Sequence, residues 1–303
     1  MQQTVLECTG LTVEYRGQRV LNGLSLSLES GGIYALVGRK GAGKTTFIRT
    51  IAGHLWQSEG QYSLFGQTGR RELERARRKV GFLIDEPVFI ATMTARQNLK
   101  AVAKIKAAKR VDYDRLLTLA GVENLSRSIM NGYSIGMRLR YAVAAALVGD
   151  PELLVLDEPI RGVNGGGVRD FWRMMREVHE QWGSTILIVC EELRDVYGLA
   201  DKFIFMREGK VVAVRTAGEI AGCCTRRIVL RTSDDASAVH ALKRVADEVE
   251  LTGDGIVVLS QRLSADEISQ SMKANGIEIR NIEQSGQDVS EYYNSLIGGG
   301  QNA

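Results

Sequence analysis

Two short motifs in this chain of 303 residues combine residue types that handle phosphate groups. The first is GRKGAGKT at 38–45, between the apolar segment IYALV and the helix-forming segment TTFIRTIAG. Glycines let backbone N–H groups approach phosphate oxygens, and the following helix N-terminus adds a positive dipole end. The motif therefore predicts a P-loop in which Lys44 reaches the β- and γ-phosphates of a nucleotide and Thr45 is a magnesium ligand. The alternative is a glycine-rich turn that only caps a helix.

The second motif is acidic and ends another apolar segment, ELLVLDEP at 152–159. A carboxylate at Asp157 is suited to the magnesium shell, and one at Glu158 is suited to orienting or deprotonating an attacking water. Two carboxylates in a helix-capping loop are the alternative. A P-loop alone is compatible with kinases, GTPases and motor ATPases, and the acidic pair narrows this set.

A third segment lies between the first two motifs. YSIGM begins at Tyr133, 24 residues before Asp157, and in isolation it is equally typical of a helix N-terminus capped by Ser134. The order P-loop, Ser-x-Gly and Asp-Glu resembles the ATP-binding subunits of ATP-binding-cassette (ABC) transporters, over residues 5 to about 220. The resemblance implies ATP and Mg²⁺ as ligands and catalysis by Glu158 and Lys44. It also implies a head-to-tail dimer in which Ser134 and Gly136 face the nucleotide on the other chain's P-loop.

The resemblance assigns further positions. Tyr15 matches the residue that stacks on adenine, although a core tyrosine at a strand end is the alternative. The segment VGFLIDEPVFIATMTARQNL resembles the loop that contacts magnesium and the membrane subunit, and it is most similar to bacitracin and lantibiotic exporters, with Asp85 in place of the usual Gln. The implied metal ligands are thus Thr45, Asp85 and Asp157. The implied nucleotide-binding residues are Tyr15, Val20, Gly38, Arg39, Lys40, Gly41, Ala42, Gly43, Lys44, Thr45, Thr46, Ser134 and Gly136.

The sequence departs from the family pattern around the same site. Glu191 stands where the family has a histidine that holds the γ-phosphate, and Asn164 stands where it has an aspartate. Two negative unit charges 4 Å apart repel by about 4 kcal/mol at an effective dielectric near 20. Glu191 is therefore a candidate catalytic-site residue with two possible consequences. Either the subunit hydrolyses ATP and powers an exporter of antimicrobial peptides or drugs, as the retained Glu158 favours, or it is a degenerate regulatory subunit paired with an active ATPase chain.

The elements that position these motifs are predicted by alternating β-branched and helical segments. From Val5 to about Gly222 the alternation predicts an α/β nucleotide-binding domain at 1–222 with a mainly parallel sheet and a helical subdomain at about 68–148. Residues 223–303 have the order β-α-β-β-α-β, which predicts a small α+β accessory domain.

Composition excludes several other classes. Apolar residues make up 44% of the chain and the formal net charge is +3, which is ordinary for a globular protein and does not by itself suggest a nucleic-acid partner; we expect none. The longest apolar run, 141–148, is far below the roughly 18 residues of a membrane span. Transport would thus require a transmembrane permease and a second nucleotide-binding subunit, identical or different, at the cytoplasmic face of the membrane. The basic run at 70–79 is compatible with a solvated face, or with a contact to lipid headgroups or a membrane subunit.

Overall fold

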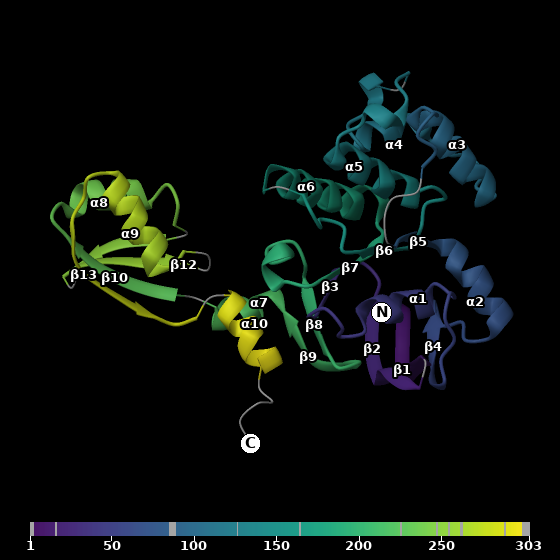
Figure 1. The fold of residues 1–303 in the computed structure, drawn as a ribbon, viewed down its shortest axis with the longest axis horizontal. Helices are drawn as coiled ribbons and strands as arrows, with labels where there is room; N and C mark the ends of the chain where they lie inside the picture. The colour runs from purple at the N-terminus through teal and green to yellow at the C-terminus, as the bar shows by residue number, and fades with distance from the viewer. Residues whose placement is uncertain are drawn as a thin grey trace. The chain divides into compact units, whose positions relative to one another are not determined.

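The computed structural model describes residues 3–15, 17–84, 89–125, 127–163, 165–224, 226–246, 248–253, 255–260, 263–287 and 289–298. The chain forms two compact units, residues 1–214 and 215–303, which are drawn in Figure 1. None of the helices in the described ranges combines the length and the apolar character that a membrane span requires.

A six-stranded sheet with the order β5-β6-β7-β3-β8-β9 forms the centre of the first unit. Its strands are β3 (Ile33–Val37), β5 (Val80–Leu83), β6 (Leu153–Asp157), β7 (Thr185–Cys190), β8 (Lys202–Arg207) and β9 (Lys210–Thr216). The neighbours from β5 to β8 pair in parallel, which confirms the predicted fold class. Strands β3, β6 and β7 are buried along their whole length, because parallel sheets are covered on both faces. Their sequences are accordingly continuous apolar runs.

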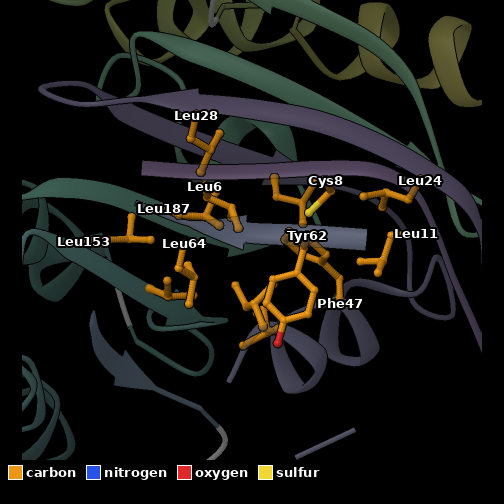
Figure 2. Packing of buried hydrophobic residues seen from close by; sticks show 14 of the residues in the cluster. Leu6, Cys8, Leu11, Leu24, Leu28, Phe47, Tyr62, Leu64, Leu153 and Leu187 are labelled. Atoms are coloured by element: carbon orange, nitrogen blue, oxygen red, sulfur yellow. The ribbon is translucent and has the colours of Figure 1, made fainter. Parts of the chain in front are cut away.

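A second, antiparallel sheet with the order β2-β1-β4 packs in the same unit. Its strands are β1 (Thr4–Tyr15), β2 (Gln18–Glu29) and β4 (Glu59–Leu64). Helix α1 (Lys44–Ile51) contacts both β2 and β6. The two sheets and α1 therefore share one core, in which Leu6, Leu24, Phe47, Leu64 and Leu153 are fully buried (Figure 2). The sequence indicated the parallel sheet but not this separate antiparallel one.

The remaining helices of the first unit are α2 (Arg70–Ala76), α3 (Ala95–Ile105), α4 (Tyr113–Leu119), α5 (Ile135–Ala146) and α6 (Gly165–Trp182). Helices α3, α4 and α5 contact one another and form a helical group (Figure 1). The segment expected as a helical subdomain, 68–148, is not uniformly helical. Strand β5 lies in the parallel sheet beside β6, and α2 contacts β4.

The second unit contains a four-stranded antiparallel sheet with the order β11-β12-β10-β13. Its elements are α7 (Ala217–Cys223), β10 (Arg226–Thr232), α8 (Asp235–Leu242), β11 (Glu248–Thr252), β12 (Gly255–Ser260), α9 (Ala265–Ala274), β13 (Ile279–Ser285) and α10 (Val289–Gly298). The order from β10 to β13 is the ferredoxin-like β-α-β-β-α-β arrangement. The unit begins before α7, earlier than the sequence-based boundary after residue 222. The amide of Gln287 donates to the Cys223 carbonyl at 3.4 Å, which ties α7 to this unit.

Candidate functional site

The predicted P-loop connects the buried strand β3 to helix α1, and glycine is required at two of its positions. Gly43 has a φ of 102°, and a Cβ there would lie 2.8 Å from the Val20 carbonyl oxygen. A Cβ on Gly38 would lie 2.6 Å from the Met206 carbonyl oxygen. The loop is therefore packed against the start of β2 and the end of β8 more closely than any side chain would permit.

Lys44 is folded back into this loop. Its ammonium donates to the carbonyl of Gly38 at 2.5 Å and to that of Arg39 at 3.3 Å, and it lies 3.6 Å from a carboxylate oxygen of Glu158. Only 6% of the lysine side chain is exposed. A buried cation is thus held within the concave side of the loop, where phosphate oxygens would replace part of its present partners.

The other predicted residues of the P-loop differ in the solvent exposure of their side chains. Arg39, Lys40 and Gly41 are exposed, whereas Ala42 is buried and Thr45 and Thr46 are half-buried. The amide of Gly209 donates to the Ala42 carbonyl at 2.9 Å, and the amide of Gly38 donates to the Cys190 carbonyl at 3.2 Å. Sequence reasoning missed these two anchors, because they come from distant segments. Only the Glu208–Gly209 hairpin turn carried a recognisable signal, and both its residues have positive φ.

The acidic pair lies at the end of β6, where the backbone turns sharply. Glu158 has a φ of 46°, an uncommon left-handed conformation for a residue with a side chain. Its amide donates to the Val189 carbonyl at 2.9 Å, which holds this turn against β7. Asp157 is the last residue of β6 and is buried. Burial raises the pKa of Glu158 above its ordinary value, and the charges of Glu191 and Asp157 add to this, whereas Lys44 lowers it.

A cavity of about 630 Å³ joins these groups. Thr45, Asp157 and Glu158 line it, together with Ile135, Arg138 and Leu139 of α5. Hydroxyl and carboxylate oxygens are the donors that Mg²⁺ prefers, so the residues present fit this ion, with Thr45 and Asp157 as the groups that would hold it. Asp85, the third predicted ligand, lies outside the described residues, as does Asn164. Sequence reasoning also missed the wall that α5 contributes.

Glu191 follows β7 directly, and β7 lies between β6 and β3 in the sheet. It is half-buried, and its charge raises the pKa of Glu158. The structure therefore brings together Lys44, Glu158 and Glu191, the three predicted catalytic-site residues, at one edge of the sheet.

Three other predicted nucleotide-binding residues, Tyr15, Val20 and Ser134, do not line this cavity. Tyr15, at the end of β1, is 53% exposed, which excludes the alternative of a core tyrosine. Val20 is half-buried in β2, and its carbonyl faces Gly43 of the loop. Ser134 accepts the Met137 amide at 3.3 Å and so caps α5, yet it remains exposed. An exposed Ser134 is accessible to another chain.

Comparison with known proteins agrees with this geometry. The model of the ABC transporter family matches residues 21–161. The bacitracin transport ATP-binding protein BcrA of Bacillus licheniformis is 30% identical over 301 residues, 98% of each chain. The lantibiotic transport ATP-binding protein SrtF of Streptococcus pyogenes is 31% identical over 212 residues, 69% of this chain and 89% of that one. A solved ATP-binding subunit of an ABC transporter covers 72% of this chain and 92% of its own, with 26% identity and a TM-score of 0.64. The chain therefore belongs to the ABC transporter family, as one of its ATP-binding ATPase subunits.

Proposed function

We propose that the chain hydrolyses ATP at its own site and thereby powers a transmembrane permease that exports antimicrobial peptides. One observation carries the proposal: Lys44 lies 3.6 Å from Glu158, and Glu158 shares a cavity with Thr45 and Asp157. The base and the oxygen donors that phosphoryl transfer to water requires thus line one space, and the cation forms an ion pair with the base.

Each group has a distinct part in the reaction. Lys44 stabilises the negative charge that develops on the transferred phosphoryl group. Glu158 accepts the proton of the attacking water, and its raised pKa improves it as a base, because a base is most effective when its pKa lies near the working pH. Thr45 and Asp157 would hold Mg²⁺, which would neutralise phosphate charge.

The cargo and the assembly are supported by the relatives and by the exposure of Ser134. The relatives are named for bacitracin and lantibiotic transport, which supports a peptide antibiotic as cargo. The exposed Ser134 supports a pair of nucleotide-binding chains, identical or different, in which α5 of one chain closes over the P-loop of the other. We place this pair on the cytoplasmic face of the membrane, bound to the permease.

The test is ATP hydrolysis by the complex purified with its permease, comparing the native chain with Glu158→Gln. We expect turnover to fall about 10²- to 10⁴-fold, the usual contribution of a general base. Binding of the slowly hydrolysed analogue ATPγS shows whether the variant still takes up nucleotide. Glu152→Gln is the matched control, because this glutamate is exposed and pairs with Lys79 outside the cavity. It should leave turnover unchanged.

A degenerate regulatory subunit is the second candidate, and Glu191 is the observation that favours it. Its charge raises the pKa of Glu158, and Glu191 directly follows Cys190, whose carbonyl accepts the amide of Gly38 in the P-loop. A negative charge there opposes the γ-phosphate. Unchanged turnover in Glu158→Gln, with ATPγS binding retained and a second ATPase chain in the purified complex, would establish this candidate in place of the first.

A further inference from the structure

The positive charge of this chain is concentrated in one short segment. Residues 70–79 contain six basic and two acidic side chains, a net charge of +4, whereas the whole chain has a net charge of +3. The other residues together are therefore slightly acidic. The segment forms α2 and the 3₁₀ turn Arg77–Lys79 that continues it, beside β4 in the first unit (Figure 1).

Two of the six cations serve the fold. Arg77 is half-buried, and its guanidinium donates to the Ile51 carbonyl at 2.9 Å and to the Tyr62 hydroxyl at 2.5 Å. Lys79 forms an ion pair with Glu152 at 2.8 Å. Neither cation is available as an isolated charge to a partner molecule.

Three other arginines form an exposed row, which we call the arginine ridge: Arg71, Arg75 and Arg78. They are spaced i, i+4 and i+7, so they share one helix face, opposite the buried Leu73 and Ala76. Among the described residues, none of the three arginines forms an ion pair or a side-chain hydrogen bond.

Helix α6 shows that this spacing alone does not leave arginines unpaired. Arg169, Arg173 and Arg176 have the same i, i+4, i+7 spacing there and are also exposed. Arg173 lies 3.6 Å from the carboxylate of Asp170, and Arg176 donates to the Gly198 carbonyl at 2.7 Å. Unlike Arg173 and Arg176, the three arginines of the ridge have no ion-pair or side-chain hydrogen-bond partner among the described residues, although Glu72 and Glu74 lie on the same helix.

An exposed aromatic residue from another segment packs against Arg70, the first residue of α2. The Trp56 side chain is 56% exposed, and the guanidinium of Arg70 stacks on its ring at 4.5 Å from the centroid. Tryptophan has an apolar body and one N–H donor, which suits it to the boundary between headgroups and acyl chains. Arginine binds phosphate oxygens through two parallel N–H groups, so a row of arginines fits a layer of phosphate groups.

We propose that the arginine ridge, together with Arg70 and Trp56, binds the acidic phospholipid headgroups of the membrane that holds the permease. Charge complementarity selects this partner. The ridge is only about two helical turns long, roughly 10 Å, so it matches clustered single headgroups better than an extended polyanion. Membrane contact through this surface does not depend on hydrolysis at the nucleotide site, and the two proposals fail separately.

The test is flotation of the purified full-length chain with vesicles of 40 mol% phosphatidylglycerol in phosphatidylcholine. We expect binding to these vesicles and little binding to pure phosphatidylcholine. The variant Arg71→Gln/Arg75→Gln/Arg78→Gln should lower the partition coefficient on the order of 100-fold, since each basic residue near such a surface contributes about 1 kcal/mol. Salt at 0.5 M should weaken binding of the native chain, because it screens exposed charges.

The matched control is Arg169→Gln/Arg173→Gln/Arg176→Gln, which removes the same charge at the same spacing from α6. It should keep vesicle binding, and both variants should bind ATPγS like the native chain, which shows that they are folded. Equal loss of vesicle binding in both variants would mean that only net charge matters and would overturn the proposal. So would a ridge variant that keeps vesicle binding but no longer copurifies with the permease, since the surface would then contact protein.

Discussion

Glu158 competes with nucleotide for the ammonium of Lys44, and removal of its charge should therefore tighten nucleotide binding. The two groups are 3.6 Å apart, with 6% of the lysine and 24% of the glutamate side chain exposed. At an effective dielectric near 20, this separation corresponds to an attraction of about 4 to 5 kcal/mol. A γ-phosphate that approaches Lys44 meets the same carboxylate as a repulsive charge.

The net effect is smaller than the Coulomb energy, because Glu158 also loses hydration in the folded site, as its raised pKa indicates. Hydrogen bonds to charged groups contribute about 1.5 to 3 kcal/mol net to stability, and we take this range for the Lys44–Glu158 contact. We therefore expect Glu158→Gln to bind ATPγS about 10- to 150-fold more tightly than the native chain. ADP should gain less, because it lacks the phosphate that the carboxylate repels.

Isothermal titration calorimetry of the purified chain with ATPγS and with ADP measures both affinities. Glu158→Asp retains the charge and should not show the gain, and Glu152→Gln controls for loss of a glutamate elsewhere. If Glu158→Gln bound ATPγS no better than the native chain, Lys44 would not be restrained by this carboxylate and the competition would be refuted.

Three further predictions concern the site and its support. The acid limb of the pH–rate profile should lie above the ordinary glutamate pKa of 4.5, because a general base must be deprotonated and the pKa of Glu158 is raised. Glu191→Gln should move this limb to lower pH, since the charge of Glu191 raises the pKa of Glu158. A limb that stays in place would contradict this effect of Glu191 on Glu158. Gly43→Ala should abolish ATPγS binding, whereas Gly41→Ala, which shares the backbone strain of a positive φ (85°) but whose added Cβ meets nothing within 4 Å, should reduce it less. Arg77→Met should lower the free energy of unfolding by about 2 to 4 kcal/mol in urea titrations, because two hydrogen bonds from a charged donor are lost, and a change below 1 kcal/mol would refute this role.

Local patterns in the sequence predicted the parts of the site that lie on continuous segments. The P-loop, the Asp157–Glu158 pair and the Ser134 cap each combine a strand or helix end with a residue type that is needed there. The carbonyl of Val20 and the cavity wall from Arg138 could not be predicted in this way. They depend on which distant segments pack against the loop, and this is decided by the tertiary fold.

The antiparallel sheet and the position of β5 were missed for a related reason. A four-residue strand such as Val80–Leu83, next to a basic helix, does not show by itself which sheet it joins. Its pairing with β6 places Leu83 at the cavity, and the helical group begins later than the sequence indicated. The β-α-β-β-α-β order of the second unit was easier to predict, because its strands and helices follow one another as separate short segments of the chain.

The order of strands in the sheet explains why we expect Glu191 to influence both the pKa of Glu158 and the binding of the γ-phosphate. The carboxyl ends of neighbouring parallel strands meet at one edge, and β7 lies between β6, which carries the base, and β3, which carries the P-loop. A residue that follows β7 therefore lies between the ends of the strands that carry Glu158 and the P-loop. The charge of Glu191 raises the pKa of Glu158, which we expect to make Glu158 a stronger base, and we expect the same charge to repel a γ-phosphate and so to slow hydrolysis. Because Glu191→Gln should remove both effects, the affinity for ATPγS reports the repulsion of the γ-phosphate and the acid limb of the pH–rate profile reports the pKa of Glu158.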